Sequence, residues 1–117
     1  MTLATGTIHR TGSGTVEFPI RGAMTLTWTK IDRENARLRV QGRMGTYECA
    51  MAWVYKRQDQ DGVPVDWCWN GAAEIEGYRM FIEGRRSGDV LEVQFLDAVQ
   101  PYAGPLAVVD GDGRVVA

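Results

Sequence analysis

Aromatic side chains are the residues of this chain best suited to a specific chemistry, the binding of a flat or apolar molecule. Trp53 and Tyr55 stand two positions apart, Trp67 and Trp69 do the same, and Tyr78 follows. Residues spaced by two share one face of a β-strand. Aromatic walls with few polar groups are typical of small-ligand pockets. These five residues are therefore the predicted ligand-binding site, and the alternative is that they only fill a packed core.

The groups that catalysis requires are sparse. His9 is the single histidine, and no serine or cysteine stands beside it in a nucleophile motif. The Asp-Gly segments 59–62 and 110–113 lack the further acidic ligands of a calcium loop. Zinc would have to rely on this histidine, two cysteines and carboxylates. We therefore expect no enzyme, no metal site and no cofactor.

A basic strip is a further candidate for binding. Arg37, Arg39 and Arg43 alternate along one predicted strand, and the threonines of 25–29 are expected beside them. Arginine and hydroxyl side chains contact phosphates on nucleic-acid-binding sheets. However, no aromatic residue stands among the arginines, and the chain has a net charge of −2. Weak anion or nucleic-acid binding through the Arg37–Arg43 strand is therefore the third hypothesis for function.

The elements that must position these residues are short strands. Apolar and polar residues alternate with a period of two, and glycines separate the runs, which predicts an antiparallel meander without a long helix. The expected strands are 6–10, 15–20, 24–29, 37–43, 47–57, 67–75, 78–82 and 91–95, with a further short pair near the C-terminus. The expected tight connections are 12–14, 44–45, 60–62, 76–77 and 87–88.

These connections also predict which residues face each other. The three-residue loop at 60–62 sets Trp53 opposite Trp69 and Tyr55 opposite Trp67. By the same counting, Lys56 faces Asp66 on the other side of the sheet. The remaining predicted pairs are Ile75 with Tyr78, Ile82 with Val93, and Leu38 with Met51.

Eight antiparallel strands can hide their edges by closing into a barrel or by folding into two packed sheets. The predicted strand 47–57 has 11 residues and would span roughly 35 Å, which is long for a small sandwich. We therefore expect an all-β single domain over 1–117, an antiparallel meander of about eight strands that is barrel-like, with 101–117 as a C-terminal extension or hairpin. A two-sheet β-sandwich is the alternative.

In strand number and length this arrangement resembles the small up-and-down barrels of the lipocalin and avidin groups. The segment Gly45-Thr46-Tyr47-Glu48 is similar to a short stretch of avidin-like chains. The tryptophan-containing strand ends that enclose the ligand in avidins have no counterpart here. The resemblance therefore implies an architecture and carries over no functional residue.

The two cysteines point to opposite faces in the predicted register, so we expect Cys49 and Cys68 to be free thiols. Free thiols are typical of a reducing compartment. Hydrophobic residues make up 44% of the chain and charged residues 24%, as in ordinary globular domains. The first residues lack a basic and apolar leader, and no apolar run is long enough to span a bilayer. We therefore expect a soluble cytoplasmic protein.

Small apolar residues fall on the outward face of the predicted sheet. Ala50, Ala52, Val54 and Ala72 belong to this outer patch. Monomers rarely leave such a patch uncovered, so we expect either the C-terminal segment or a second copy of the chain to cover it. The competing hypothesis for function is therefore a structural or interaction protein, for example an assembly component, that forms a homodimer through these four residues.

Overall fold

The computed structural model describes residues 2–97, and its only regular elements are strands. Within this range there is no helix of the length and apolarity that crossing a membrane requires. The predicted extension or hairpin at 101–117 lies outside the described residues. The strands are β1 (Thr2–Ile8), β2 (Ser13–Phe18), β3 (Gly22–Lys30), β4 (Asn35–Gln41), β5 (Thr46–Gln58), β6 (Pro64–Ile75), β7 (Tyr78–Ser87) and β8 (Val90–Asp97).

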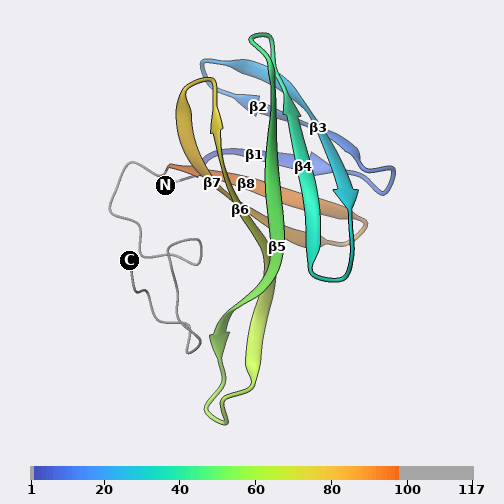
Figure 1. Ribbon diagram of the computed structural model, residues 1–117, viewed down its shortest axis with the longest axis vertical. Coiled ribbons are helices and arrows are strands. Elements are labelled where there is room, and N and C mark those ends of the chain that lie inside the picture. Colours follow the sequence, from blue (N-terminus) through green and yellow to red (C-terminus); the bar gives the residue numbers. More distant parts are fainter. Residues whose placement is uncertain (1, 98–117) are drawn as a thin grey trace.

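The sheet is a closed barrel (Figure 1). Each strand pairs antiparallel with the next in the chain, and β1 pairs with β8 from Thr2↔Leu96 to Ile8↔Leu91. The prediction of an all-β, eight-stranded antiparallel barrel is confirmed. The alternative of a two-sheet sandwich is wrong, because the pairing of β1 with β8 joins all strands into one continuous sheet.

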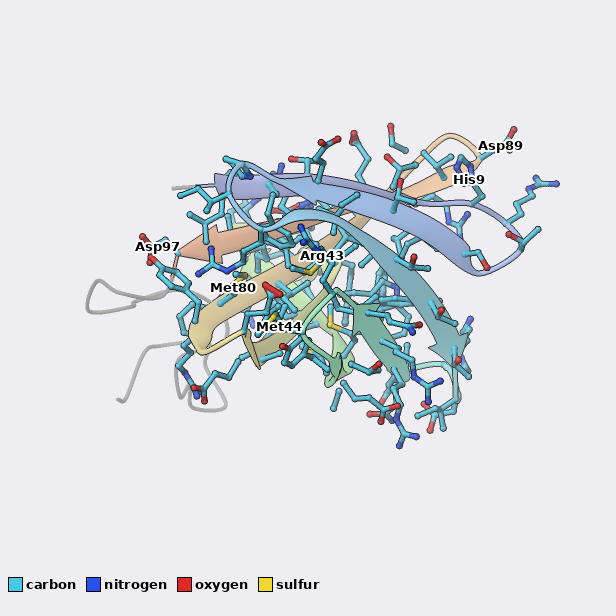
Figure 2. The ribbon with its side chains drawn as sticks, turned by 90° about the horizontal axis from the view of Figure 1, so that it is seen from above. His9, Arg43, Met44, Met80, Asp89 and Asp97 are labelled. Atoms are coloured by element: carbon cyan, nitrogen blue, oxygen red, sulfur yellow. The ribbon has the colours of Figure 1, made fainter. Side chains whose placement is uncertain are left out.

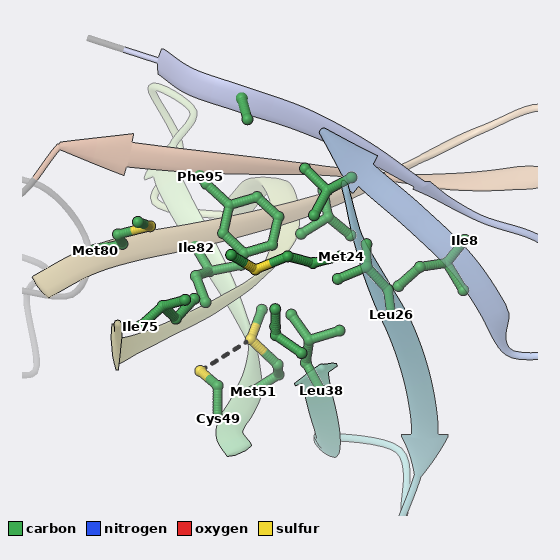
Figure 3. Packing of buried hydrophobic residues seen from close by; sticks show 14 of the residues in the cluster. Ile8, Met24, Leu26, Leu38, Cys49, Met51, Ile75, Met80, Ile82 and Phe95 are labelled. Carbon is green, nitrogen blue, oxygen red and sulfur yellow. Dashed lines mark hydrogen bonds between the residues drawn. The ribbon is translucent and has the colours of Figure 1, made fainter. Parts of the chain in front are cut away.

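The middle of the barrel is filled by a hydrophobic core (Figure 3). Met24, Met51, Ile82 and Phe95 converge there, and each is 2% exposed or less. Phe18 packs edge-on against Phe95, with 5.2 Å between the ring centroids. The alternation of apolar residues predicts these inward faces correctly. Side chains therefore occupy the middle of the barrel.

Two of the predicted connections form as expected. The amide of Gly62 donates to the carbonyl of Asp59 at 3.0 Å, and that of Asp59 donates to Val63 at 2.9 Å. This three-residue loop produces the predicted pairs Trp53↔Trp69 and Tyr55↔Trp67. Between β6 and β7, Glu76 and Gly77 both have positive φ, as a type I′ turn requires, and Ile75 pairs with Tyr78.

Two predicted registers are wrong by two residues each. Gly88, with φ of +64°, takes the first central position of the β7–β8 turn, so Ile82 pairs with Phe95 instead of Val93. Between β4 and β5 a four-residue loop, 42–45, closes with a hydrogen bond from the Gly42 amide to the Gly45 carbonyl. Leu38 therefore pairs with Cys49 instead of Met51. A shift of two residues leaves every side chain on its predicted face.

The first hairpin also lies earlier in the chain than predicted. Ser13 and Gly14, which were expected in the connection, belong to β2 and pair with Thr27 and Leu26. The connection is 9–12, where the amide of Gly12 donates to the carbonyl of His9 at 2.9 Å. Gly12 has φ of +87°, a conformation that glycine adopts without strain.

Both cysteines are free and buried, as predicted for the thiol state. The Cys49 thiol lies in the core, 3.6 Å from the sulfur of Met51, and donates to the carbonyl of Ala72. Burial raises the pKa of Cys49 to about 11. Cys68, expected on the solvent side, is 0% exposed, and burial raises its pKa as well.

Gly71 allows β5 and β6 to approach each other inside the barrel. A methyl group there would overlap with the sulfur of Met51 and lie 2.5 Å from that of Cys49. We expect Gly71→Ala to lower the free energy of unfolding by about 1–3 kcal/mol, the usual cost of overpacking a core. Chemical denaturation measures this change.

Gly84→Ala is the matched control, because Gly84 faces the same interior from β7 and its added methyl would have its nearest contact at 3.4 Å. It should cost less than about 1 kcal/mol. Equal losses in the two variants would contradict the packing argument.

The buried Cys49 thiol makes stability depend on pH. In the unfolded chain this thiol titrates near its ordinary pKa of 9.0, whereas in the native state its pKa is about 11. Above pH 9 the unfolded state therefore loses a proton that the native state keeps, and the free energy of unfolding falls by up to about 1.4 kcal/mol per pH unit up to pH 11. Urea denaturation between pH 8 and 11 should show a shallower fall for Cys49→Ala. Cys68 is present in both proteins, so parallel curves would refute the assignment to Cys49.

Candidate ligand-binding cleft

A cleft of about 840 Å³ lies at one end of the barrel. Figure 2 shows His9 and Asp89 beside each other at this end, with Asp97 at the far end of the molecule. Small-ligand sites have volumes of about 300–1,000 Å³, so the cleft has the size of such a site. Its lining residues are Ile8, His9, Arg10, Thr11, Gly12, Trp28, Lys30, Arg33, Trp53, Trp69, Arg86, Asp89 and Leu91.

Three tryptophans form the aromatic wall of the cleft. The ring centroid of Trp69 lies 5.2 Å from that of Trp28, at an interplanar angle of 79°, and 5.3 Å from that of Trp53. Trp28 extends from β3 and Trp69 from β6, two strands that are not neighbours in the sheet. Trp69 is 9% exposed and Trp53 is 36% exposed. Trp69 therefore caps the core, while Trp53 presents aromatic surface to the solvent.

Backbone hydrogen bonds from two connections hold this wall in place. The amide of Trp28 donates to the carbonyl of Gly12 at 2.7 Å, and the amide of Trp53 donates to that of Glu34 at 2.9 Å. A Cβ at position 12 would lie 2.9 Å from the carbonyl oxygen of Trp28. Glycine is therefore needed where the first turn meets the tryptophan strand.

The structure brings only part of the predicted ligand site together. Trp53 and Trp69 line the cleft. Trp67 and Tyr55 lie further along the β5–β6 hairpin, which projects beyond the body of the barrel (Figure 1). Trp67 stacks on Trp53 at 6.0 Å and 12°, and Tyr55 meets Trp67 edge-on at 5.5 Å. Tyr78 lies at the opposite end, next to the β6–β7 turn, where the Arg21 guanidinium sits 5.0 Å from its ring.

Two kinds of cleft residue were not assigned from the sequence. Trp28 belongs to the correctly predicted inward face of its strand, and that alternation was the available signal for it. Lys30, Arg33 and Arg86 come from three separate elements and share no local motif. Only the closed topology brings them to one rim.

The cleft is lined by polar as well as aromatic residues. His9 lines it together with the hydroxyl-bearing Thr11. Within residues 2–97 no group of three histidine, cysteine, aspartate or glutamate side chains could hold a metal ion. Aromatic surface and positive charge are the features that the cleft offers to a small molecule.

Two arginines of the predicted basic strip share one carboxylate. Arg39 contacts Glu48 at 2.7 Å, and Arg37 lies 3.9 Å from the same residue. The hydrogen bond from Arg39 lowers the pKa of Glu48. Arg43 lies in the β4–β5 loop instead of the strand. The strip therefore carries less free positive charge than the sequence indicates.

The outer patch is partly shielded in this structure. Ala50 is exposed, whereas Ala52, Val54 and Ala72 are half-buried. Phe81, which pairs with Ala72 and also points outward, is 8% exposed. Self-association through the four predicted interface residues stays a prediction.

An ion-pair network joins β5, β6 and β7 where the projecting hairpin leaves the barrel. Lys56, expected to face Asp66, contacts Glu83 at 2.6 Å. Arg85 contacts Glu83 at 2.8 Å and also pairs with Asp66. Burial alone would raise the pKa of Glu83, but the hydrogen bonds from Lys56 and Arg85 outweigh it and lower that pKa. The network therefore fixes the root of the hairpin that carries Trp53.

Comparisons of the chain with protein-family models, with curated proteins and with solved structures found no match. The structure itself shows a closed antiparallel barrel of eight strands, and the resemblance to lipocalins and avidins stays a prediction from the sequence.

Removing the central charge of the network should destabilise the protein in a pH-dependent way. Glu83→Gln leaves Lys56 and Arg85 without their shared carboxylate and should lower the free energy of unfolding by about 1 kcal/mol at pH 7. Because the native pKa of Glu83 is lowered, its contribution is present above the ordinary pKa of 4.5 and is lost as the pH falls below it. Denaturation at pH 7 and pH 3 measures the difference.

The control is Glu17→Gln, which removes an exposed carboxylate from β2. It should change stability by less than about 0.5 kcal/mol. A Glu83→Gln deficit that persists unchanged at pH 3 would show that packing, and not charge, accounts for the loss.

Proposed function

We propose that this protein binds a small apolar or aromatic molecule in the cleft at the end of the barrel. The observation that carries the proposal is the exposed face of Trp53 beside Trp28 and Trp69 in a space of about 840 Å³. When a ligand covers aromatic side chains that are in contact with water, the burial stabilises the complex by about 25 cal/mol per Å² of apolar area.

The packing of the barrel supports the end of the molecule as the binding place. The core cluster, from Ile8 to Phe95, occupies the middle, and Trp69 caps it at the cleft. The wall is therefore built on a rigid base, because its tryptophans are held by the core below and by the backbone hydrogen bonds of Trp28 and Trp53. Such preorganisation lowers the entropic cost of binding.

The neutral probe N-phenyl-1-naphthylamine tests the proposal. We expect its fluorescence to rise on addition of the protein, with energy transfer from the cleft tryptophans. Trp53→Ala should weaken its binding about fivefold or more, which corresponds to roughly 1 kcal/mol of aromatic contact. Fluorescence titration gives both affinities, and circular dichroism verifies that the variant keeps its fold.

Tyr78→Ala is the matched control, because Tyr78 is an aromatic residue at the opposite end of the barrel, beside Arg21, and does not line the cleft. Its effect on the affinity should stay below about twofold. The proposal fails if the probe does not bind or if both variants lose affinity equally.

A further inference from the structure

We infer that the ligand is an organic anion whose flat, apolar body lies on the tryptophan wall and whose acidic group lies at the rim of the same cleft. This inference rests on the proposed function and narrows it to one chemical class.

The rim of the cleft is mainly positively charged, whereas the chain as a whole has a net negative charge. Arg10, Lys30, Arg33 and Arg86 line the cleft, with Asp89 as the single acidic residue among the lining residues. The whole chain has 13 basic and 15 acidic residues. Positive charge is therefore concentrated at this end of the barrel, where it raises the local concentration of anions.

Within residues 2–97, most of this positive charge has no carboxylate partner. Arg10 and Asp89 form an ion pair at 3.2 Å, in which both side chains are about 80% exposed. In the described part of the chain, no carboxylate lies within 4.0 Å of the charged groups of Lys30, Arg33 or Arg86. The arginines of β4 and the cations at the hairpin root, in contrast, are paired.

The acidic residues of the β3–β4 loop do not neutralise the rim. Neither Asp32 nor Glu34 lines the cleft. The carboxylate of Asp32 accepts hydrogen bonds from the amide of Glu34 at 2.8 Å and from the side chain of Asn35 at 2.9 Å. It is thus used to shape its own loop, and Arg33 stays available to a ligand.

The arrangement suits a compact anion better than a nucleic acid strand. Guanidinium groups bind carboxylates, sulfonates and phosphates through paired hydrogen bonds. A single strand requires a basic path with successive stacking positions. Here the cations gather at one barrel end, whereas Arg37 and Arg39 on the neighbouring face share the carboxylate of Glu48. The basic region is therefore confined to the rim of the cleft, where it can bind one acidic group of a compact ligand.

Two probes with the same aromatic body isolate the acidic group. The probe 8-anilino-1-naphthalenesulfonate differs from N-phenyl-1-naphthylamine by its sulfonate. At low ionic strength we expect the sulfonate to bind about tenfold more tightly, and we expect added salt to reduce this preference because the rim is exposed to solvent. Lys30→Met combined with Arg86→Met should abolish most of the preference and leave the affinity for the neutral probe within about twofold.

Arg43→Met is the matched control, because it removes an exposed positive charge from the β4–β5 loop at the other end of the barrel. It should leave the preference intact. Equal binding of both probes by the wild type overturns the inference and leaves the proposed function standing. Binding of neither probe overturns the proposed function and, with it, the inference. A competition experiment covers the remaining alternative. If oligothymidylate displaces bound 8-anilino-1-naphthalenesulfonate at lower concentrations than naphthalenesulfonate does, the inference is overturned in favour of a nucleic acid ligand.

Discussion

The antiparallel pairing of β1 with β8 is the interaction on which the rest of the structure depends. It removes the last free edges of the barrel wall and turns the inward faces of eight strands into one enclosed core. Because every strand reverses direction, the connections β1–β2, β3–β4, β5–β6 and β7–β8 all leave the sheet on the same side. Residues as distant in the chain as Arg10 and Asp89 therefore meet. The cleft therefore results from two features of the sheet, its closure into a barrel and the alternating direction of its strands.

The sequence predicts the faces of the strands well and their registers less well. The period of two depends only on which residues are apolar, and it places Met51, Ile82 and Phe95 on inward faces, where the structure has them. Registers depend on turn geometry, and one glycine can serve at more than one turn position. Gly88 fits the second position of one turn and the first of another, and the pairing of Ser87 with Val90 in the structure distinguishes them.

The residues of the candidate site also differ in how far the sequence predicts them. Trp53 and Trp69 could be predicted because they share a strand face and lie close together across one hairpin. Tyr78 shares that face but lies at the other end, because its strand begins after a turn at the far side of the barrel. The cations of the rim come from separate elements, and no local pattern joins them. Their meeting requires the closed sheet, which no stretch of sequence specifies alone.

The β5–β6 hairpin is longer than the strands on either side of it. Its pairing with β4 ends at Ala52 and its pairing with β7 begins at Trp69, so the stretch between them is held in the ladder only by its own two strands. Opening this stretch breaks the ladder of one hairpin, its ion pairs to β7 and the hydrogen bond of Trp53 to Glu34, whereas opening any other strand breaks into the core. The molecule thus has two levels of local stability. Trp53 stands at the boundary between them, so a molecule bound against it would contact both the part of the wall that lies over the core and the root of the projecting hairpin.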